Sequence, residues 1–166
     1  LTSSYMPLGA MGVSDAISAY FRKNVFMGGL TYNSHALALG TALAVIDVME
    51  EEDLVGNAAR LESVMHEEMA KLKARHPTVK TYRAIGLFGI VDLQKNAAGE
   101  PMAPYNGTAP AMVALTKRLQ ELSLFTFVRW ASFSCNPPLC ITEAELRQGY
   151  AIIDEALEVT HAYFEG

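Results

Sequence analysis

The sequence predicts a chain of the α/β class, in which a small α+β domain follows a short piece of a larger domain. Apolar residues recur every three or four positions, as in amphipathic helices, in four segments: 35–51, 54–74, 108–122 and 142–164. Two other segments, 79–93 and 125–135, are instead rich in β-branched and aromatic residues, as strands are. With a first strand expected within residues 1–13, the order is strand, three helices, strands, helix, strands and helix.

The first fifty residues are predicted to contain one strand and two helices. Pro7 fixes φ and removes a hydrogen-bond donor, so residues 1–13 are expected to be extended and to start a strand at an edge or bend. Ser14 is placed to cap a short helix that runs through Phe21. Asn33 or Ser34 is expected to cap the next helix, from His35 to Glu51, whose many small residues indicate close packing.

The acidic run Glu50–Asp53 marks a break between helices, and we place a domain boundary there: residues 1–50 end a large domain and residues 51–166 form a small α+β domain. Gly86 and Gly89 punctuate two strand segments between Thr81 and Leu93. A capping box of Thr142 and Glu145 opens the last helix.

Composition and charge exclude several kinds of partner. Hydrophobic residues make up 51% of the 166 residues, which is enough for a packed core, and the net charge of −5 argues against nucleic acid and anionic membranes. No apolar run approaches the ~20 residues that span a bilayer, and no signal-peptide pattern opens the chain. Cys135 and Cys140 form neither a disulfide framework nor a metal motif, so we expect free thiols, a cytoplasmic protein and no bound metal.

The opening stretch carries the strongest resemblance to a known family. Residues 1–10 read Leu-Thr-Ser-Ser-Tyr-Met-Pro-Leu-Gly-Ala. This string resembles a segment of the class III pyridoxal-phosphate (PLP) aminotransferases, the ω-aminotransferase group, which reads Lys-Gly-[Leu/Val]-Thr-Ser-x-Tyr-x-Pro-Leu-Gly-Ala. In that family the lysine carries the cofactor as a Schiff base. The resemblance therefore implies a catalytic lysine two residues before Leu1 and none within this chain.

The resemblance extends along the chain and implies its architecture. The chain resembles the C-terminal part of a fold-type I PLP-dependent transferase, with a three-layer-type C-terminal domain and a short piece of the large PLP-binding domain. It also implies a homo-oligomer, either a dimer or a tetramer. None of the six lysines of the chain is expected in the enclosed setting that a Schiff-base lysine needs.

Thr31 and Tyr32 are the candidate cofactor-binding residues. From spacing alone, Thr31 is a loop threonine with a local hydroxyl bond. However, the run Leu-Thr-Tyr-Asn-Ser-His over residues 30–35, followed by an alanine-rich helix, resembles the family's second signature. There the threonine binds the cofactor phosphate of the neighbouring subunit. A hydroxyl and backbone amides near a helix N-terminus are suited to a dianion.

Arg129 and Tyr5 are the candidate substrate-binding residues. On general grounds Arg129 is a surface residue or a cation–π partner of Trp130. In the family, an arginine before a Pro-Pro-Leu-x-Ile-Thr segment binds the α-carboxylate of the amino or keto acid, and residues 137–142 match that segment. The spacer 130–136 lacks the Gly-Asp that often follows the arginine. Tyr5 either packs or lines the substrate entrance.

The resemblance implies transfer of an amino group from an amine or ω-amino acid to a keto acid such as pyruvate, with PLP as cofactor. Two alternatives remain open at this point. One is a relative that uses the same scaffold for decarboxylation or amino-group migration. The other is a non-catalytic α+β module for binding or oligomerisation. His66, His76 and His161 are expected to be ordinary helix-associated residues.

Overall fold

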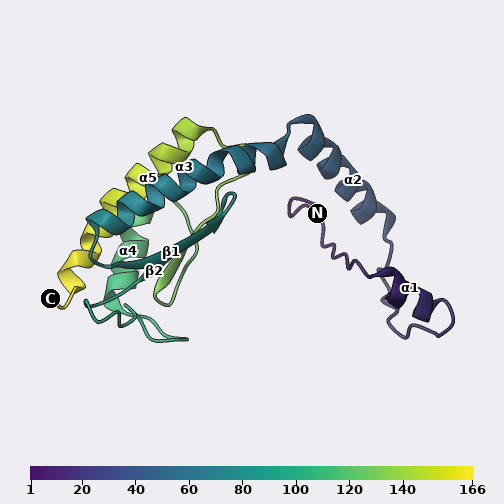
Figure 1. Ribbon diagram of the computed structural model, residues 1–166, viewed down its shortest axis with the longest axis horizontal. Coiled ribbons are helices and arrows are strands. Elements are labelled where there is room, and N and C mark those ends of the chain that lie inside the picture. Colours follow the sequence, from purple (N-terminus) through teal and green to yellow (C-terminus); the bar gives the residue numbers. More distant parts are fainter. The chain divides into compact units, whose positions relative to one another are not determined.

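The computed structural model of the chain describes all residues from Leu1 to Gly166. They form two compact units, Leu1–Asp53 and Leu54–Gly166, and each unit is described by itself. Figure 1 shows the helices and strands of both. The first unit is helical, and the second contains the sheet together with the helices that cover it.

The first unit contains α1 (Asp15–Phe21) and α2 (Ala36–Glu51). The strand expected within residues 1–13 is wrong, because this segment contains turns and no strand. Ser3 and Ser4 have positive φ angles of 47° and 65°, and the amide of Tyr5 donates to the carbonyl of Thr2 at 3.0 Å. A strand needs a neighbouring strand to receive its backbone hydrogen bonds, and none pairs with this segment.

The two helices of this unit begin in different ways. Ser14 caps α1 as predicted, its hydroxyl accepting from the amide of Ile17. The predicted cap of α2 is wrong, because Ser34 takes a positive φ of 56° and His35 is the N-cap, without a side-chain bond. The first amides of α2 therefore have no side-chain acceptor.

The second unit has four strands and three α-helices, with the bounds α3 Leu54–Arg75, β1 Val79–Ile85, β2 Phe88–Leu93, α4 Pro110–Glu121, β3 Val128–Arg129, β4 Ser132–Cys135 and α5 Glu143–Leu157. The strands pair in the order β1-β2-β4-β3, and every pair is antiparallel. The Thr142–Glu145 capping box opens α5 as predicted. This mixture of helices with a small antiparallel sheet is the α+β arrangement that the sequence predicts.

Two elements of this unit are shorter in the structure than the sequence predicts. The strand expected over 125–129 shortens to the two residues of β3, although the carbonyl of Phe127 still accepts from the amide of Ser134. The last helix changes to a 3₁₀ helix over Glu158–Tyr163. There the buried Thr160 bonds Thr78 at 2.8 Å, which ties this turn to the chain that leads into β1.

The core lies on one face of the sheet. Val91 and Leu93 of β2 and Phe133 and Cys135 of β4 are buried, whereas the residues between them are more exposed. Since neighbouring side chains of a strand point to opposite faces, α3, α4 and α5 cover one face and leave the other open. Figure 1 shows α3 and α5 side by side along the sheet.

Gly89 permits the close approach of α3 to the sheet. A Cβ atom at this position would lie 2.6 Å from the terminal methyl of Met69 and 2.7 Å from that of Met65. Both methionines are fully buried in the core. The sequence pattern treats Gly89 as a break between strands, but it is an interior residue of β2 that makes room for a helix.

His76 forms a buried polar connection between the ends of α3 and α5. Its ring is fully buried, with Nε2 2.8 Å from Asp154 Oδ1 and Nδ1 2.8 Å from His161 Nε2. Arg75 forms an ion pair with the same aspartate. Buried polar atoms with partners on both sides are well satisfied, so this cluster fixes the C-terminal turn against α3.

Candidate functional site

Arg129 lies on the open face of the sheet, at the end of β3. It pairs in register with Ser132 of β4, and Ser132 pairs with Asp92 of β2, so the three side chains form one row across the sheet. Arg129 is exposed and has no carboxylate within ion-pair distance, in contrast to Arg83, which is bound to Asp92. An unpaired guanidinium keeps both of its forked donors available for a carboxylate ligand.

Arg83 of β1 is joined to this row by a hydrogen bond to Asp92. Asp92 accepts from Arg83 Nη2 at 3.2 Å and from the hydroxyl of Ser132 at 2.6 Å. The carboxylate therefore has partners on two strands, and it neutralises one arginine of the site. Of the two arginines on this face, Arg83 is paired with Asp92, and only Arg129 lacks a carboxylate partner.

These polar residues line a pocket of about 380 Å³. Its other walls are apolar and include Ile90, Phe127 and Trp130. A cavity of this kind, mainly apolar with a few convergent polar groups, is typical of small-molecule sites. It can hold a small carboxylate with the charged end at Arg129 and the carbon chain against the aromatic rings.

Trp130 fixes the position of the Arg129 side chain. The Arg129 guanidinium carbon lies 4.2 Å from the centre of the Trp130 ring. The centres of the Tyr105 and Trp130 rings are 4.3 Å apart. Trp130 itself has a φ of 52°, in the left-handed region that bulky residues seldom adopt. The tight turn between β3 and β4 thus imposes backbone strain at Trp130, the residue that stacks on Arg129.

The segment that follows β4 is held by two asparagines. Asn57 of α3 donates to the carbonyl of Leu139 at 2.8 Å and to that of Ile141 at 2.9 Å. Asn136 accepts from the amide of Gly89 at 3.1 Å. The Pro137–Thr142 segment is therefore anchored to α3 and to the sheet, which fixes it relative to the hairpin that carries Arg129.

Thr31 and Tyr32 lie together in the first unit, in the turn before α2. The amide of Asn33 donates to the carbonyl of Leu30 at 3.1 Å and closes this turn, and both side chains are exposed. The Nδ1 atom of His35 is buried without a hydrogen-bond partner. The Thr31 hydroxyl and the first amides of α2, which have no side-chain cap, are hydrogen-bond donors of the kind that suits a phosphate.

Tyr5 also belongs to the first unit. Its side chain is 79% exposed, and its backbone is held by the turn that the buried Thr2 closes through its hydroxyl and the carbonyl of Met6. Tyr5 does not pack in this unit, which leaves its ring available to a ligand. Tyr5, Thr31 and Tyr32 therefore belong to the first unit, whereas Arg129, the candidate carboxylate-binding residue, belongs to the second.

The lysines of the chain are solvated. Five are exposed and Lys95 is half-buried. Glu67 and Glu68 raise the pKa of Lys71, and Glu100 raises the pKa of Lys95, so both amines stay charged. No three His, Cys, Asp or Glu side chains are arranged to hold a metal ion, and no helix is both long and apolar enough to cross a bilayer.

Sequence reasoning missed Arg83, Asp92 and Ser132 as parts of the site. Each is polar and lies in a strand segment, where a solvated face is the ordinary explanation. Counting outward from the turn at Gly86 pairs Ile85 with Phe88 and Arg83 with Ile90, which places Arg83 on the same face as Asp92 and diagonal to it. This count could have been made from the sequence, because the position of the turn determines the register of a hairpin.

Comparison with known proteins identifies relatives over nearly the whole chain. The family model described as Aminotransferase class-III matches residues 1–157. Taurine–pyruvate aminotransferase of Bilophila wadsworthia is 32% identical over 88% of this chain and 32% of its own length. Diaminobutyrate–2-oxoglutarate transaminase of Halomonas elongata is 28% identical over 98% of this chain and 36% of its own. The chain thus spans about a third of the length of these curated relatives.

Solved structures agree with these relatives. Taurine:2-oxoglutarate aminotransferase from Bifidobacterium kashiwanohense, in complex with PLP and glutamate, superposes with a TM-score of 0.92 and 31% identity. The match covers 99% of this chain and 37% of that one. A transaminase from the marine bacterium Virgibacillus gives a TM-score of 0.85 with 29% identity over 97% of this chain.

Proposed function

Because the chain belongs to the class-III aminotransferase family, we propose that it forms the C-terminal part of a PLP-dependent aminotransferase. In this proposal the whole protein moves an amino group from an amine or ω-amino acid to a keto acid such as pyruvate. The observation that carries the assignment of a carboxylate substrate is the unpaired guanidinium of Arg129 in its apolar-walled pocket. Relatives named for pyruvate and for 2-oxoglutarate both support a keto acid as acceptor.

We infer that residues 1–50 end the large PLP-binding domain and that residues 51–166 form the small C-terminal domain, a boundary close to the division between the two units at Asp53. The first unit supports this inference because many of its apolar side chains lack cover. Leu37 and Leu43 of α2 are 62% and 64% exposed, whereas only Ala38 and Ala42 of that helix are buried. Such a helix needs further protein around it.

We propose that the exposed apolar side of α2 packs in a homo-oligomer, a dimer or a tetramer. Closed symmetric assemblies bury self-complementary surfaces of this kind. The protein is proposed to be cytoplasmic, because Cys135 and Cys140 are both free thiols, as is usual in a reducing compartment.

The turn before α2 is the proposed phosphate site for PLP. The Thr31 hydroxyl and the first amides of α2 would hold the phosphate, with Tyr32 beside them, in the interface with a neighbouring subunit. When bound, PLP withdraws electrons from the carbon that bears the amino group. The residues of this chain supply binding and orientation, and a Schiff-base lysine is proposed to lie outside it.

Arg129 is proposed to orient the substrate. Its two parallel donors would hold the carboxylate of the keto or amino acid and fix the direction of the reacting carbon. The Trp130 ring restricts the guanidinium to one orientation, and Asp92 keeps Arg83 from competing for the same carboxylate. Tyr5 would line the entrance for the substrate.

The proposal is tested by comparing the whole protein with this chain. The whole protein, supplied with PLP, is expected to convert pyruvate to alanine at the expense of an amine donor. The chain alone is expected to give no turnover, and borohydride reduction with PLP should modify none of its six lysines stoichiometrically. Selective and complete modification of one lysine in the chain alone would contradict the assignment of the Schiff-base lysine.

Replacing Thr31 with alanine in the whole protein is expected to weaken PLP binding by about 1–3 kcal/mol, because the charged phosphate then lacks one hydrogen-bond donor. The dissociation constant of PLP, measured by equilibrium dialysis, checks this. Thr41→Ala is the matched control, since the Thr41 hydroxyl only bonds the Leu37 carbonyl of its own helix. Equal PLP affinity of the Thr31 variant and the wild type would remove Thr31 from the phosphate site.

A further inference from the structure

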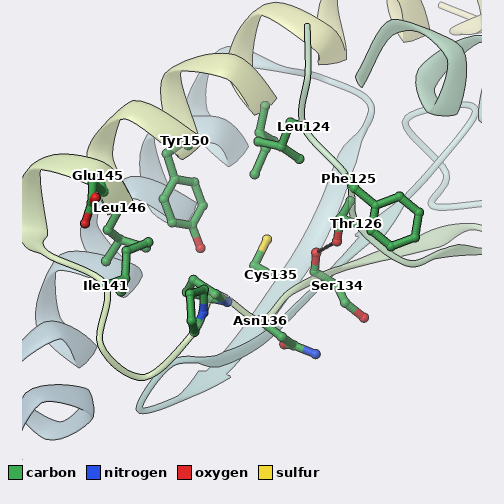
Figure 2. Close-up of a pocket in the computed structure, with 14 residues that line it drawn as sticks. Leu124, Phe125, Thr126, Ser134, Cys135, Asn136, Ile141, Glu145, Leu146 and Tyr150 are labelled. Carbon is green, nitrogen blue, oxygen red and sulfur yellow. Dashed lines mark hydrogen bonds between the residues drawn. The ribbon is translucent and has the colours of Figure 1, made fainter. Parts of the chain in front are cut away.

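A second pocket, of about 240 Å³, lies between α5, the end of β4 and the segment 136–141. Figure 2 shows its lining, which is mostly apolar. Leu124, Ile141, Leu146 and Ile153 contribute aliphatic walls. An apolar cavity of about 150 Å³ is large enough to bind benzene, so this one has room for a ring with a short substituent.

The hydroxyl of Tyr150 has no oxygen or nitrogen partner in this pocket, and its polar neighbour is the weakly bonding thiol of Cys135. Tyr150 is only 3% exposed, and its Oη atom is buried without a hydrogen bond. Figure 2 shows its ring extending from α5 with the hydroxyl end toward Cys135. A buried hydroxyl that has lost its water and gained only a weak thiol neighbour is costly, and it needs an explanation such as a bound molecule.

Both neighbouring polar groups remain protonated donors at neutral pH. Burial raises the pKa of the Cys135 thiol to about 12, and the Tyr150 hydroxyl offsets only part of this shift. Burial also raises the pKa of Tyr150, and Cys135 adds to that increase. Tyr150 and Cys135 therefore present an O–H donor and a weak S–H donor to the pocket, and neither group is ionised.

Three other polar side chains of the lining, those of Thr126, Asn136 and Glu145, take part in hydrogen bonds. The Thr126 hydroxyl donates to the carbonyl of Ser134, and Asn136 accepts from the amide of Gly89. Glu145 accepts from the amide of Thr142 at 2.9 Å and from its hydroxyl at 2.7 Å. No cation lines the pocket, so an anionic ligand would have no counter-charge.

We propose that this pocket binds a small, uncharged and largely apolar molecule that carries one hydrogen-bond acceptor for Tyr150 Oη. The aliphatic walls supply most of the affinity by removing the ligand's apolar surface from water. Tyr150 selects for the acceptor, because any ligand without one leaves the hydroxyl unpaired. The proposal is independent of the amino-transfer function and concerns residues of the second unit alone.

Benzonitrile and phenylacetylene form a matched pair of probes for this pocket. They have nearly the same shape, but only the nitrile nitrogen accepts a hydrogen bond. Titration of the 166-residue chain, followed by NMR, is expected to show millimolar binding of benzonitrile with shifts at the lining residues. The nitrile stretching band of the bound probe should move in the direction of a hydrogen-bonded nitrile.

Three variants separate the contributions. Tyr150→Phe should bind benzonitrile roughly 2- to 10-fold more weakly and phenylacetylene unchanged, with little loss of thermal stability, since the hydroxyl that it removes has only the weakly bonding Cys135 thiol beside it. Gly149→Leu should abolish binding of both, because a Cβ at Gly149 meets open space and its side chain would fill the pocket. Ala151→Leu, on the exposed side of α5, is the control and should bind as the wild type does.

Two results would overturn the proposal. One is the absence of benzonitrile binding up to its solubility limit in the wild-type chain, which would mean that the pocket holds only water. The other is equal benzonitrile affinity of Tyr150→Phe and the wild type. Melting curves of all variants show that each is folded, so neither result can be attributed to a misfolded protein.

Discussion

Replacing Arg129 with glutamine in the whole protein is expected to lower kcat/KM for the keto acid roughly 10- to 200-fold. Hydrogen bonds to a charged group contribute about 1.5–3 kcal/mol, and a bidentate grip on a carboxylate lies at the upper end of that range. Because Arg129 has no carboxylate partner in the chain, its removal leaves no buried protein charge unpaired, and the loss reports on the substrate.

The effect should depend on the substrate. A simple amine donor has no carboxylate, so its half-reaction is expected to be nearly unchanged. Single-turnover rates for the amine and for the keto acid, measured separately, give this comparison. Arg129→Lys should recover only part of the loss, because an ammonium cannot form the two parallel bonds of the planar guanidinium.

A structural role for Arg129 predicts a different pattern. If the guanidinium only supports Trp130, on which it stacks at 4.2 Å, both half-reactions should fall together with the melting temperature. Arg118→Gln is the matched control, since Arg118 pairs with Glu121 and Glu155 on the surface. Equal losses in both half-reactions of the Arg129 variant would remove it from the substrate site.

The helices were predictable because their signals are local. The 3- and 4-residue spacing of Leu61, Val64, Met65, Met69 and Leu72 fixes the buried side of α3 whatever lies against it. The capping box of Thr142 and Glu145 likewise depends on residues three positions apart. Such local patterns can be recognised without knowing how the rest of the chain folds.

The open face of the sheet could not be predicted in the same way. The row of Arg129, Ser132 and Asp92 depends on the pairing of three strands, of which β3 has only two residues. The register of β3 is set by the turn at Trp130, which has a left-handed backbone conformation. An aromatic residue in the sequence gives no reason to expect that conformation. The resemblance named Arg129 from its distance to the Pro-Pro-Leu segment, but the structure was needed to place its neighbours.

The N-terminal errors have a related cause. Residues 1–13 look extended because Pro7 and the glycines disfavour a helix, but an extended sequence becomes a strand only where another strand accepts its backbone bonds. In the same way, a serine before a helix is a cap only if its backbone is extended. Ser34 has a φ of 56°, so the position passes to His35.

Replacing Phe133 with alanine in the 166-residue chain is expected to lower the free energy of unfolding by about 3–5 kcal/mol, the usual cost of removing a buried aromatic ring. Phe133 is 2% exposed and lies on the face of β4 that the helices cover. Urea denaturation followed by circular dichroism measures the loss. Phe133→Leu should lose less, because it leaves a smaller cavity, and it remains measurable if the alanine variant unfolds.

Phe88→Ala is the matched control, because Phe88 lies on β2 but on the open face and is 67% exposed. Its loss is expected to change stability by no more than about 0.5 kcal/mol. The comparison tests the register from which the site is built, since the alternation that buries Phe133 places Ser132 and Arg129 on the opposite face. If Phe88→Ala cost as much as Phe133→Ala, the open face would be wrongly assigned, and the pocket at Arg129 with it.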